Sequence, residues 1–164
     1  MSSEKSNQPK LPTSAIDNLT NQGFKNWFEY PIKVYPHHTD YLGIVWHGSY
    51  LTWMEEARVE CLRSIGVEYS DLVALGCDLP VLELSIRYHH SLELGQTALV
   101  KTRISEATGV EINWDYAIVS PNEQELYVTA QVVLVALDRE RGKTMRQLPP
   151  DVKDVFARIT SAVK

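Results

Sequence analysis

The architecture of this chain can be worked out from residues 35–58, which read YPHHTDYLGIVWHGSYLTWMEEAR. From the second half of this stretch onward, apolar side chains recur at steps of three and four residues: Tyr50, Trp53, Met54, Ala57, Cys61 and Ile65. This spacing places them on one face of an α-helix. Ser49 can cap the start of such a helix, and Gly66 can close its end in a left-handed conformation. We therefore predict an amphipathic helix of about 16 residues after an irregular segment.

On both sides of this helix the apolar side chains change to a period of two, which is typical of β-strands. One alternating segment precedes the helix and four follow it, at residues 27–34, 82–88, 98–104, 112–118 and 126–137. The last segment is almost continuously apolar, which predicts a central strand buried on both faces. A final short helix is expected after Pro149 and Pro150, because proline is favoured in the first turn of a helix.

One strand, one long helix and four further strands predict an α+β domain. The sheet and the helix can both bury their apolar faces if an antiparallel five-stranded sheet wraps around the helix. With 164 residues and 44% hydrophobic content, the chain is large enough to close one core. We expect a polar extension at residues 1–26 and a single domain at residues 27–164, which includes the short C-terminal helix.

The composition argues against several classes of protein. The formal net charge is −5 and the basic residues form no run, so a nucleic-acid partner is not expected. No apolar stretch approaches the ~20 residues needed to cross a bilayer, so we expect no membrane insertion. Cys61 and Cys77 do not form a pattern typical of disulfide frameworks or zinc sites, which favours a reducing, cytoplasmic location.

Residues 35–58 also contain a pattern that is more specific than an amphipathic helix. Its positions are Thr39-Asp40, Gly43, Ile44, Val45, Trp46, His47, Tyr50 and Glu55-Glu56-Ala57-Arg58. In this register the stretch resembles the hotdog-fold thioesterases, both the 4-hydroxybenzoyl-CoA thioesterase type and the bacterial acyl-CoA thioesterase type associated with the Tol-Pal system. The resemblance extends over about residues 30–138. It implies a hotdog fold, hydrolysis of acyl-CoA to free acid and CoA without a cofactor, and assembly into homodimers or homotetramers whose sheets join at their edges.

Thioester hydrolysis needs a carboxylate or base that attacks or activates water, and donors for the oxygen that becomes negative. The resemblance implies that Asp40 is the nucleophile or general base and that the backbone N–H of His47 is the oxyanion donor. The start of the helix offers unpaired N–H groups and a partial positive charge for this purpose. The sequence does not choose between direct attack by Asp40 and activation of water. The competing interpretation of Asp40 is a loop residue that organises its own turn.

Six further residues are candidates for substrate binding: Gly43, Val45, Trp46, Tyr50, Arg58 and Arg87. Gly43 is expected to make a tight turn at a point where a Cβ would intrude. Tyr50 lies on the apolar helix face, either as pocket wall or as core. Arg87, Lys101 and Arg103 could meet the phosphates of CoA, or they could be ordinary solvated charges on strands. The sequence leaves open whether the acyl group is aliphatic or aromatic, and whether it is carried by CoA or by acyl carrier protein.

Three other functions stay open on the sequence. The histidines, in the groups His37-His38, His47 and His89-His90, could form a hydrolytic metal site with Asp40. Neighbouring residues on a strand point to opposite faces, however, so we expect no metal. The hotdog scaffold also hosts dehydratases and hydratases that act on acyl thioesters. Finally, the protein could bind an acyl ligand without turning it over.

Overall fold

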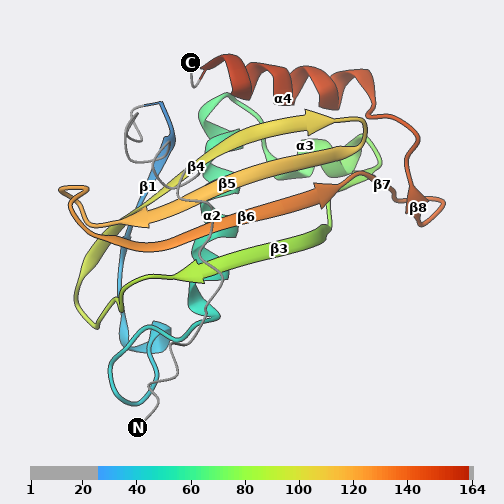
Figure 1. Cartoon of the computed structure of the whole chain (residues 1–164). Helices are drawn as coiled ribbons and strands as arrows, with labels where there is room; N and C mark the ends of the chain where they lie inside the picture. Colours follow the sequence, from blue (N-terminus) through green and yellow to red (C-terminus); the bar gives the residue numbers. More distant parts are fainter. Residues whose placement is uncertain (1–25, 163–164) are drawn as a thin grey trace, which may run out of the picture.

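The computed structural model describes residues 26–162, in which a five-stranded sheet curves around one long helix (Figure 1). The sheet contains β1 (Phe28–Lys33), β3 (Val81–Tyr88), β4 (Thr97–Thr108), β5 (Glu111–Val119) and β6 (Leu126–Val135). Their order across the sheet is β1-β4-β5-β6-β3, and every neighbouring pair is antiparallel. The predicted α+β class and five-stranded antiparallel sheet are confirmed. The extension predicted at residues 1–26 lies outside the described residues, apart from its last residue.

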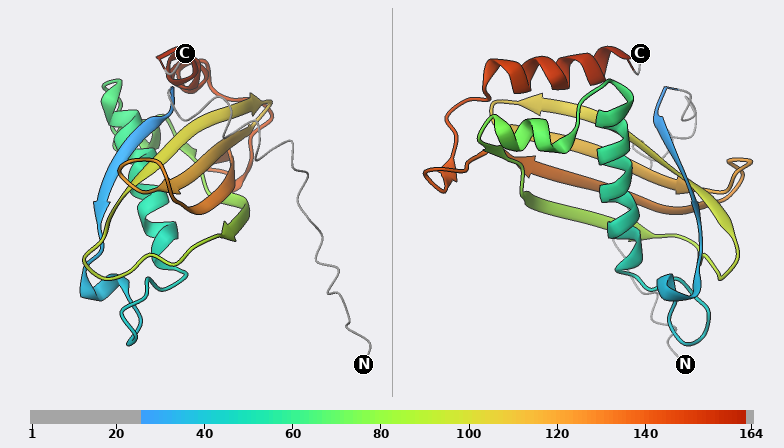
Figure 2. Two further views of the ribbon diagram at one scale, coloured as in Figure 1. Left: turned by 60° about the vertical axis from the view of Figure 1, so that its left-hand side comes forward. Right: turned by 180° about the vertical axis from the view of Figure 1, so that it is seen from behind.

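Helix α2 (Ser49–Ser64) lies across one face of this sheet (Figure 2). It has the predicted length of 16 residues, and soon after its end Gly66 takes the left-handed φ of +82°. The predicted N-cap is wrong. Gly48 is the cap, and the Ser49 hydroxyl already lies in the first turn and donates to the carbonyl of His38 at 2.8 Å. The side chains that α2 buries are Tyr50, Trp53, Met54, Ala57, Cys61 and Leu62.

Strand β6 pairs on both sides, with β5 and with β3, but it is not buried on both faces as predicted. Val128, Val132 and Leu134 are buried in the core that α2 shares, whereas Gln131 is exposed and Val133 is only partly buried. The continuous apolar run misled the prediction because β-branched residues also favour strand positions that are only partly covered.

Several short elements were not predicted. A second sheet, of order β2-β7-β8, joins β2 (Cys77–Asp78), β7 (Leu137–Asp138) and β8 (Lys143–Thr144). The 3-10 helix η1 (Pro36–His38) precedes α2 in the chain, and helix α3 (Tyr69–Ala74) follows it. Elements of two to six residues are too short to show a periodic pattern in the sequence.

The predicted C-terminal helix is present as α4 (Pro150–Ala162), which lies at the same end of the sheet as α3 (Figure 1). Its buried side chains are Val152, Val155, Phe156 and Ile159. Both cysteines are buried free thiols, and burial raises the pKa of Cys61 to about 12. Within residues 26–162, no helix is both long and apolar enough to span a membrane.

Strand β3 is an edge of the five-stranded sheet, since within the described chain it pairs with β6 alone. Large apolar side chains are exposed along it: Val81, Leu82, Leu84 and Tyr88. An exposed apolar edge of this kind is a ready partner for another strand, because its outer backbone groups have no hydrogen-bond partners in the sheet.

Candidate active site

The segment between η1 and α2 forms a tight loop. Residues Thr39 and Val45 pair as an antiparallel bridge at its base, and the N–H of Asp40 donates to the carbonyl of Ile44 at 2.8 Å. Gly43 has a φ of +77°, a conformation that a Cβ would strain. The Cβ itself would meet no protein atom closer than 3.9 Å, so the backbone conformation, not crowding by the protein, requires glycine here.

This loop is joined to the connection that follows β3. The N–H of Val45 donates to the carbonyl of Leu92 at 2.9 Å, and the N–H of Leu94 donates to the carbonyl of Gly43 at 2.9 Å. Leu92 is fully buried and anchors the connection in the core. The loop is therefore fixed against a neighbour that is distant in the sequence.

The carboxylate of Asp40 organises the loop. Its Oδ1 atom accepts hydrogen bonds from the N–H groups of Leu42 at 2.9 Å and Ile44 at 3.2 Å. Its Oδ2 atom takes part in no hydrogen bond with the described residues, and the side chain is exposed in the single chain. Asp40 thus has the turn-forming role that was its competing interpretation, and its second carboxylate oxygen is not used by the turn.

A single carbonyl links η1 to the start of α2. The carbonyl of His38 accepts from the N–H of Trp46 at 3.0 Å and from the hydroxyl of Ser49 at 2.8 Å. The ring of His38 contacts Trp53 edge-on at 4.8 Å, and its Nδ1 accepts from the N–H of Tyr35 at 2.9 Å. Burial lowers the pKa of His38, and the adjacent His37 lowers it further.

The start of α2 carries unused hydrogen-bond donors. The N–H groups of His47 and Gly48 donate to no acceptor within residues 26–162. A Cβ on Gly48 would lie 2.2 Å from the indole of Trp46, so the indole lies directly over this glycine. Gly48 was not predicted as a site residue, because its φ of −80° is ordinary and only the packing of Trp46 makes glycine necessary.

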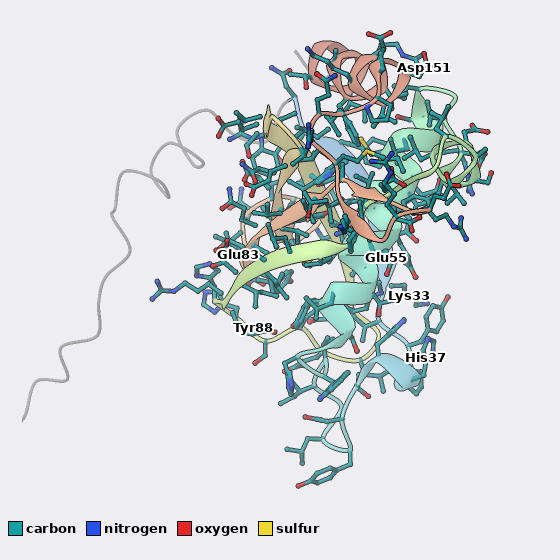
Figure 3. All side chains as sticks on the ribbon, turned by 90° about the vertical axis from the view of Figure 1, so that its right-hand side faces the viewer. Lys33, His37, Glu55, Glu83, Tyr88 and Asp151 are labelled. Carbon is teal, nitrogen blue, oxygen red and sulfur yellow. The ribbon has the colours of Figure 1, made fainter. Side chains whose placement is uncertain are left out.

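Tyr88 contacts the same helix start from the end of β3 (Figure 3). Its hydroxyl donates to the carbonyl of His47 at 2.9 Å, and its ring lies 5.5 Å from that of Tyr50, which is itself buried in the core. Burial raises the pKa of Tyr88. Tyr88 was predicted only as a residue on a strand face, with no part in the site.

The structure brings Asp40, Gly43, Val45, Trp46, His47 and Tyr50 together around the loop and the helix start. Arg58 lies elsewhere, because it comes nine residues after Ser49 along the helix, a rise of about 14 Å. Its Nη1 donates to the hydroxyl of Tyr116 at 3.1 Å. Burial raises the pKa of Tyr116 to about 12, although Arg58 acts in the opposite direction. Arg58 therefore ties α2 to β5.

The three basic residues proposed to meet CoA phosphates differ in their surroundings. Lys101 is buried and ion-paired with Glu29 and Glu123, and Arg103 pairs with Asp115 at 3.2 Å. Burial by itself lowers the pKa of Lys101, but its hydrogen bonds to both glutamates raise the pKa overall. Arg87 is exposed on β3 and has no ion pair among the described residues. Only Arg87 keeps a free charge for a phosphate.

The histidines do not gather into a metal site. In the part of the chain that the structure describes, no group of three or more His, Cys, Asp or Glu side chains is arranged to hold a metal ion. His89 is instead hydrogen-bonded to the hydroxyl of Thr129 at 2.8 Å, on the neighbouring strand β6.

Comparison with known proteins adds independent information. Residues 34–157 match the model of the thioesterase-like superfamily. A putative esterase of Synechocystis, sll0410, is 55% identical over 79% of this chain and 78% of its own. The acyl-CoA thioester hydrolase YbgC of Escherichia coli is 30% identical over 79% of this chain and 95% of its own. The structure of DHNA-CoA thioesterase from Staphylococcus aureus matches with a TM-score of 0.74 and 25% identity, over 82% of this chain and 91% of that one.

Proposed function

Because the chain belongs to the thioesterase-like superfamily, we propose that it hydrolyses acyl-CoA thioesters to a free acid and CoA, with Asp40 and the start of α2 as its machinery. The family, the hotdog fold and the thioesterase class predicted from residues 35–58 are confirmed by these relatives. The roles proposed for individual residues rest on the geometry of the loop and of the helix start.

The observation that carries the proposed mechanism is the pair of unused N–H groups at His47 and Gly48. A thioester carbonyl oxygen bound there would accept from both groups and would also gain from the partial positive charge of the helix start. The hydrogen bonds strengthen as negative charge develops on that oxygen, which is where catalysis requires them. One oxyanion donor is worth about 10²–10³ in kcat.

Asp40 supplies the second requirement. The two N–H groups that hold its Oδ1 atom orient the carboxylate, and the Oδ2 atom is left to react. In one route Oδ2 attacks the carbonyl carbon, CoA leaves as the thiolate, and water hydrolyses the resulting anhydride. In the other route Oδ2 takes a proton from water, whose oxygen attacks the same carbon. Both routes use the same position and give the same products.

We further propose that the enzyme works as a homodimer or homotetramer that is joined through the edge strand β3. Pairing of two such edges would complete the backbone hydrogen bonds and cover the apolar side chains exposed along β3. It would also shelter the helix start, which Tyr88 connects to this edge. Exposed Arg87 on the same strand is the proposed contact for CoA phosphates. The two free thiols support a reducing, cytoplasmic location.

A thiol-release assay with a panel of acyl-CoA substrates tests this function. The panel should include short and long saturated chains, aromatic acyl groups and an enoyl-CoA. We expect the wild type to release CoA from saturated or aromatic substrates. We expect Asp40→Asn to lose this release. Hydration of the enoyl substrate without CoA release would favour a hydratase, and binding without turnover would favour a ligand-binding module.

A further inference from the structure

The hydrogen bond between Tyr88 and His47 acts on a peptide group that the proposed mechanism uses. The carbonyl of His47 and the N–H of Gly48 belong to one planar trans peptide and point in opposite directions. A donor that holds this carbonyl therefore also sets the direction of the Gly48 N–H. Through the amide it also polarises that N–H, because hydrogen bonds in a chain strengthen one another.

Further contacts limit the movement of this peptide. The Tyr88 ring lies 5.5 Å from the ring of buried Tyr50, so the phenol is held from one side. The Trp46 indole covers the Cα of Gly48 from another direction. Tyr88 comes from the edge strand, so its hydrogen bond is the one described contact between β3 and the peptide that opens α2.

We propose that Tyr88 is a positioning residue that fixes the His47–Gly48 peptide, so that the Gly48 N–H is aimed, beside the His47 N–H, at the oxygen of the bound thioester. This inference rests on the proposed thioesterase function. Tyr88 does not touch the substrate carbonyl itself; it acts through the peptide. Since the oxyanion forms only as the reaction proceeds, loss of the Tyr88 hydroxyl lowers kcat and leaves KM nearly unchanged.

The sequence allows the peptide to be observed directly. His47-Gly48 is the single His-Gly step in the chain. Protein labelled with carbonyl-¹³C histidine and ¹⁵N glycine therefore gives one signal in an NMR experiment that correlates each amide with the preceding carbonyl. That signal reports the carbonyl that accepts the hydrogen bond and the N–H that is proposed to bind the substrate.

The test compares wild type, Tyr88→Phe and Tyr127→Phe. Tyr127 is the matched control, because its hydroxyl donates to Glu125 at 3.2 Å and not to the His47–Gly48 peptide. In Tyr88→Phe the His47–Gly48 signal shifts, with the carbonyl carbon moving to lower chemical shift, and kcat falls about tenfold, the worth of one net hydrogen bond, while KM stays within about twofold. Tyr127→Phe leaves the signal and kcat unchanged.

Each other outcome overturns a specific step. An unmoved signal in Tyr88→Phe shows that the hydrogen bond does not hold the peptide. A shifted signal with unchanged kcat shows that the peptide is held but that its N–H has no part in catalysis. A wild-type protein that releases no CoA removes the proposed function, and with it the catalytic role of Tyr88, while the NMR comparison still decides whether the hydrogen bond exists.

Discussion

Asp40 and Asp138 hold their turns in the same way. The Oδ1 atom of Asp40 accepts from the N–H groups of Leu42 and Ile44, and Oδ1 of Asp138 accepts from those of Glu140 and Arg141, at 3.0 and 3.1 Å. The two carboxylates thus do the same structural work at two places in the fold. If Asp40→Asn and Asp138→Asn differ in activity, loss of the turn hydrogen bonds does not explain the difference. The difference then has to come from a part that Asp40 plays in the reaction.

We expect Asp40→Asn to lower kcat by about 10³-fold, because the amide oxygen can still hold the turn but cannot attack or accept a proton. Asp138→Asn should leave kcat within about twofold. Thiol release gives kcat, and urea unfolding should give similar midpoints for the two variants. Equal kcat values would mean that Asp40 only organises its loop.

Variants of Arg87 and Arg103 should distinguish an effect on substrate binding from an effect on stability. Arg87→Gln should raise KM for acyl-CoA about fivefold with kcat unchanged, because the phosphates of CoA are remote from the reacting carbon. The effect should shrink at high salt, which screens exposed charges. Arg103→Gln should instead lower stability, since it loses Asp115 and its position over the Trp27 ring at 4.4 Å. A larger rise of KM in Arg103→Gln would contradict this assignment.

Substitutions of Leu84 and Leu75 test whether the protein assembles through the edge strand β3. Both side chains are about equally exposed in the single chain, at 40% and 43%, but Leu84 lies on β3 and Leu75 follows α3. Leu84→Glu should shift the protein to monomers in sedimentation velocity, because two carboxylates would face each other across paired edges. Leu75→Glu should keep the assembly. The reverse result would place the interface elsewhere.

His38 predicts a pH dependence of stability. Its folded-state pKa is lowered, first by burial and then by His37, below the ordinary value of about 6.5. As the pH falls, His38 therefore binds a proton in the unfolded chain before it does so in the folded chain. Its contribution to the free energy of unfolding is present above about pH 6.5 and is lost as the pH falls toward the folded pKa. Urea midpoints of the wild type should fall between about pH 7.5 and pH 5.5.

His38→Asn should show a shallower decline of these midpoints, because asparagine can still accept the Tyr35 N–H but does not titrate. Burial also lowers the pKa of His89. His89 would therefore account for part of the pH dependence that stays in His38→Asn. An unchanged slope in His38→Asn would show that His38 does not contribute to the pH dependence of stability.

The main elements of the fold were predictable because each is long enough to repeat its pattern. The 16 residues of α2 complete more than four helical turns, and the strands of the large sheet are six to twelve residues long. The three strands of the small sheet have two residues each. Strands β7 and β8 pair across a short turn, but what defines β2 is its pairing with β7, far away in the chain. No local pattern carries that information.

The site was only partly predictable for a similar reason. Asp40 and His47 lie in one short motif, whereas Tyr88 joins His47 across 41 positions of sequence. Gly48 could not be singled out without knowledge of where the Trp46 indole lies. Arg58 falls within the motif, but the rise of the helix carries it away to Tyr116. Lys101 and Arg103 look like free charges in the sequence, and their partners come from other segments.

The connection after β3 serves both halves of the site. It follows directly on Tyr88, the last residue of β3, which is bonded to the helix start. A few residues later, Leu92 and Leu94 are bonded to the loop that carries Asp40. Adding or deleting a single residue within this connection would shift one set of bonds relative to the other, and would move the carboxylate out of register with the peptide donors. The spacing of these few backbone atoms therefore sets the distance between the Asp40 carboxylate and the proposed oxyanion site, and engineering of acyl preference would have to leave it intact.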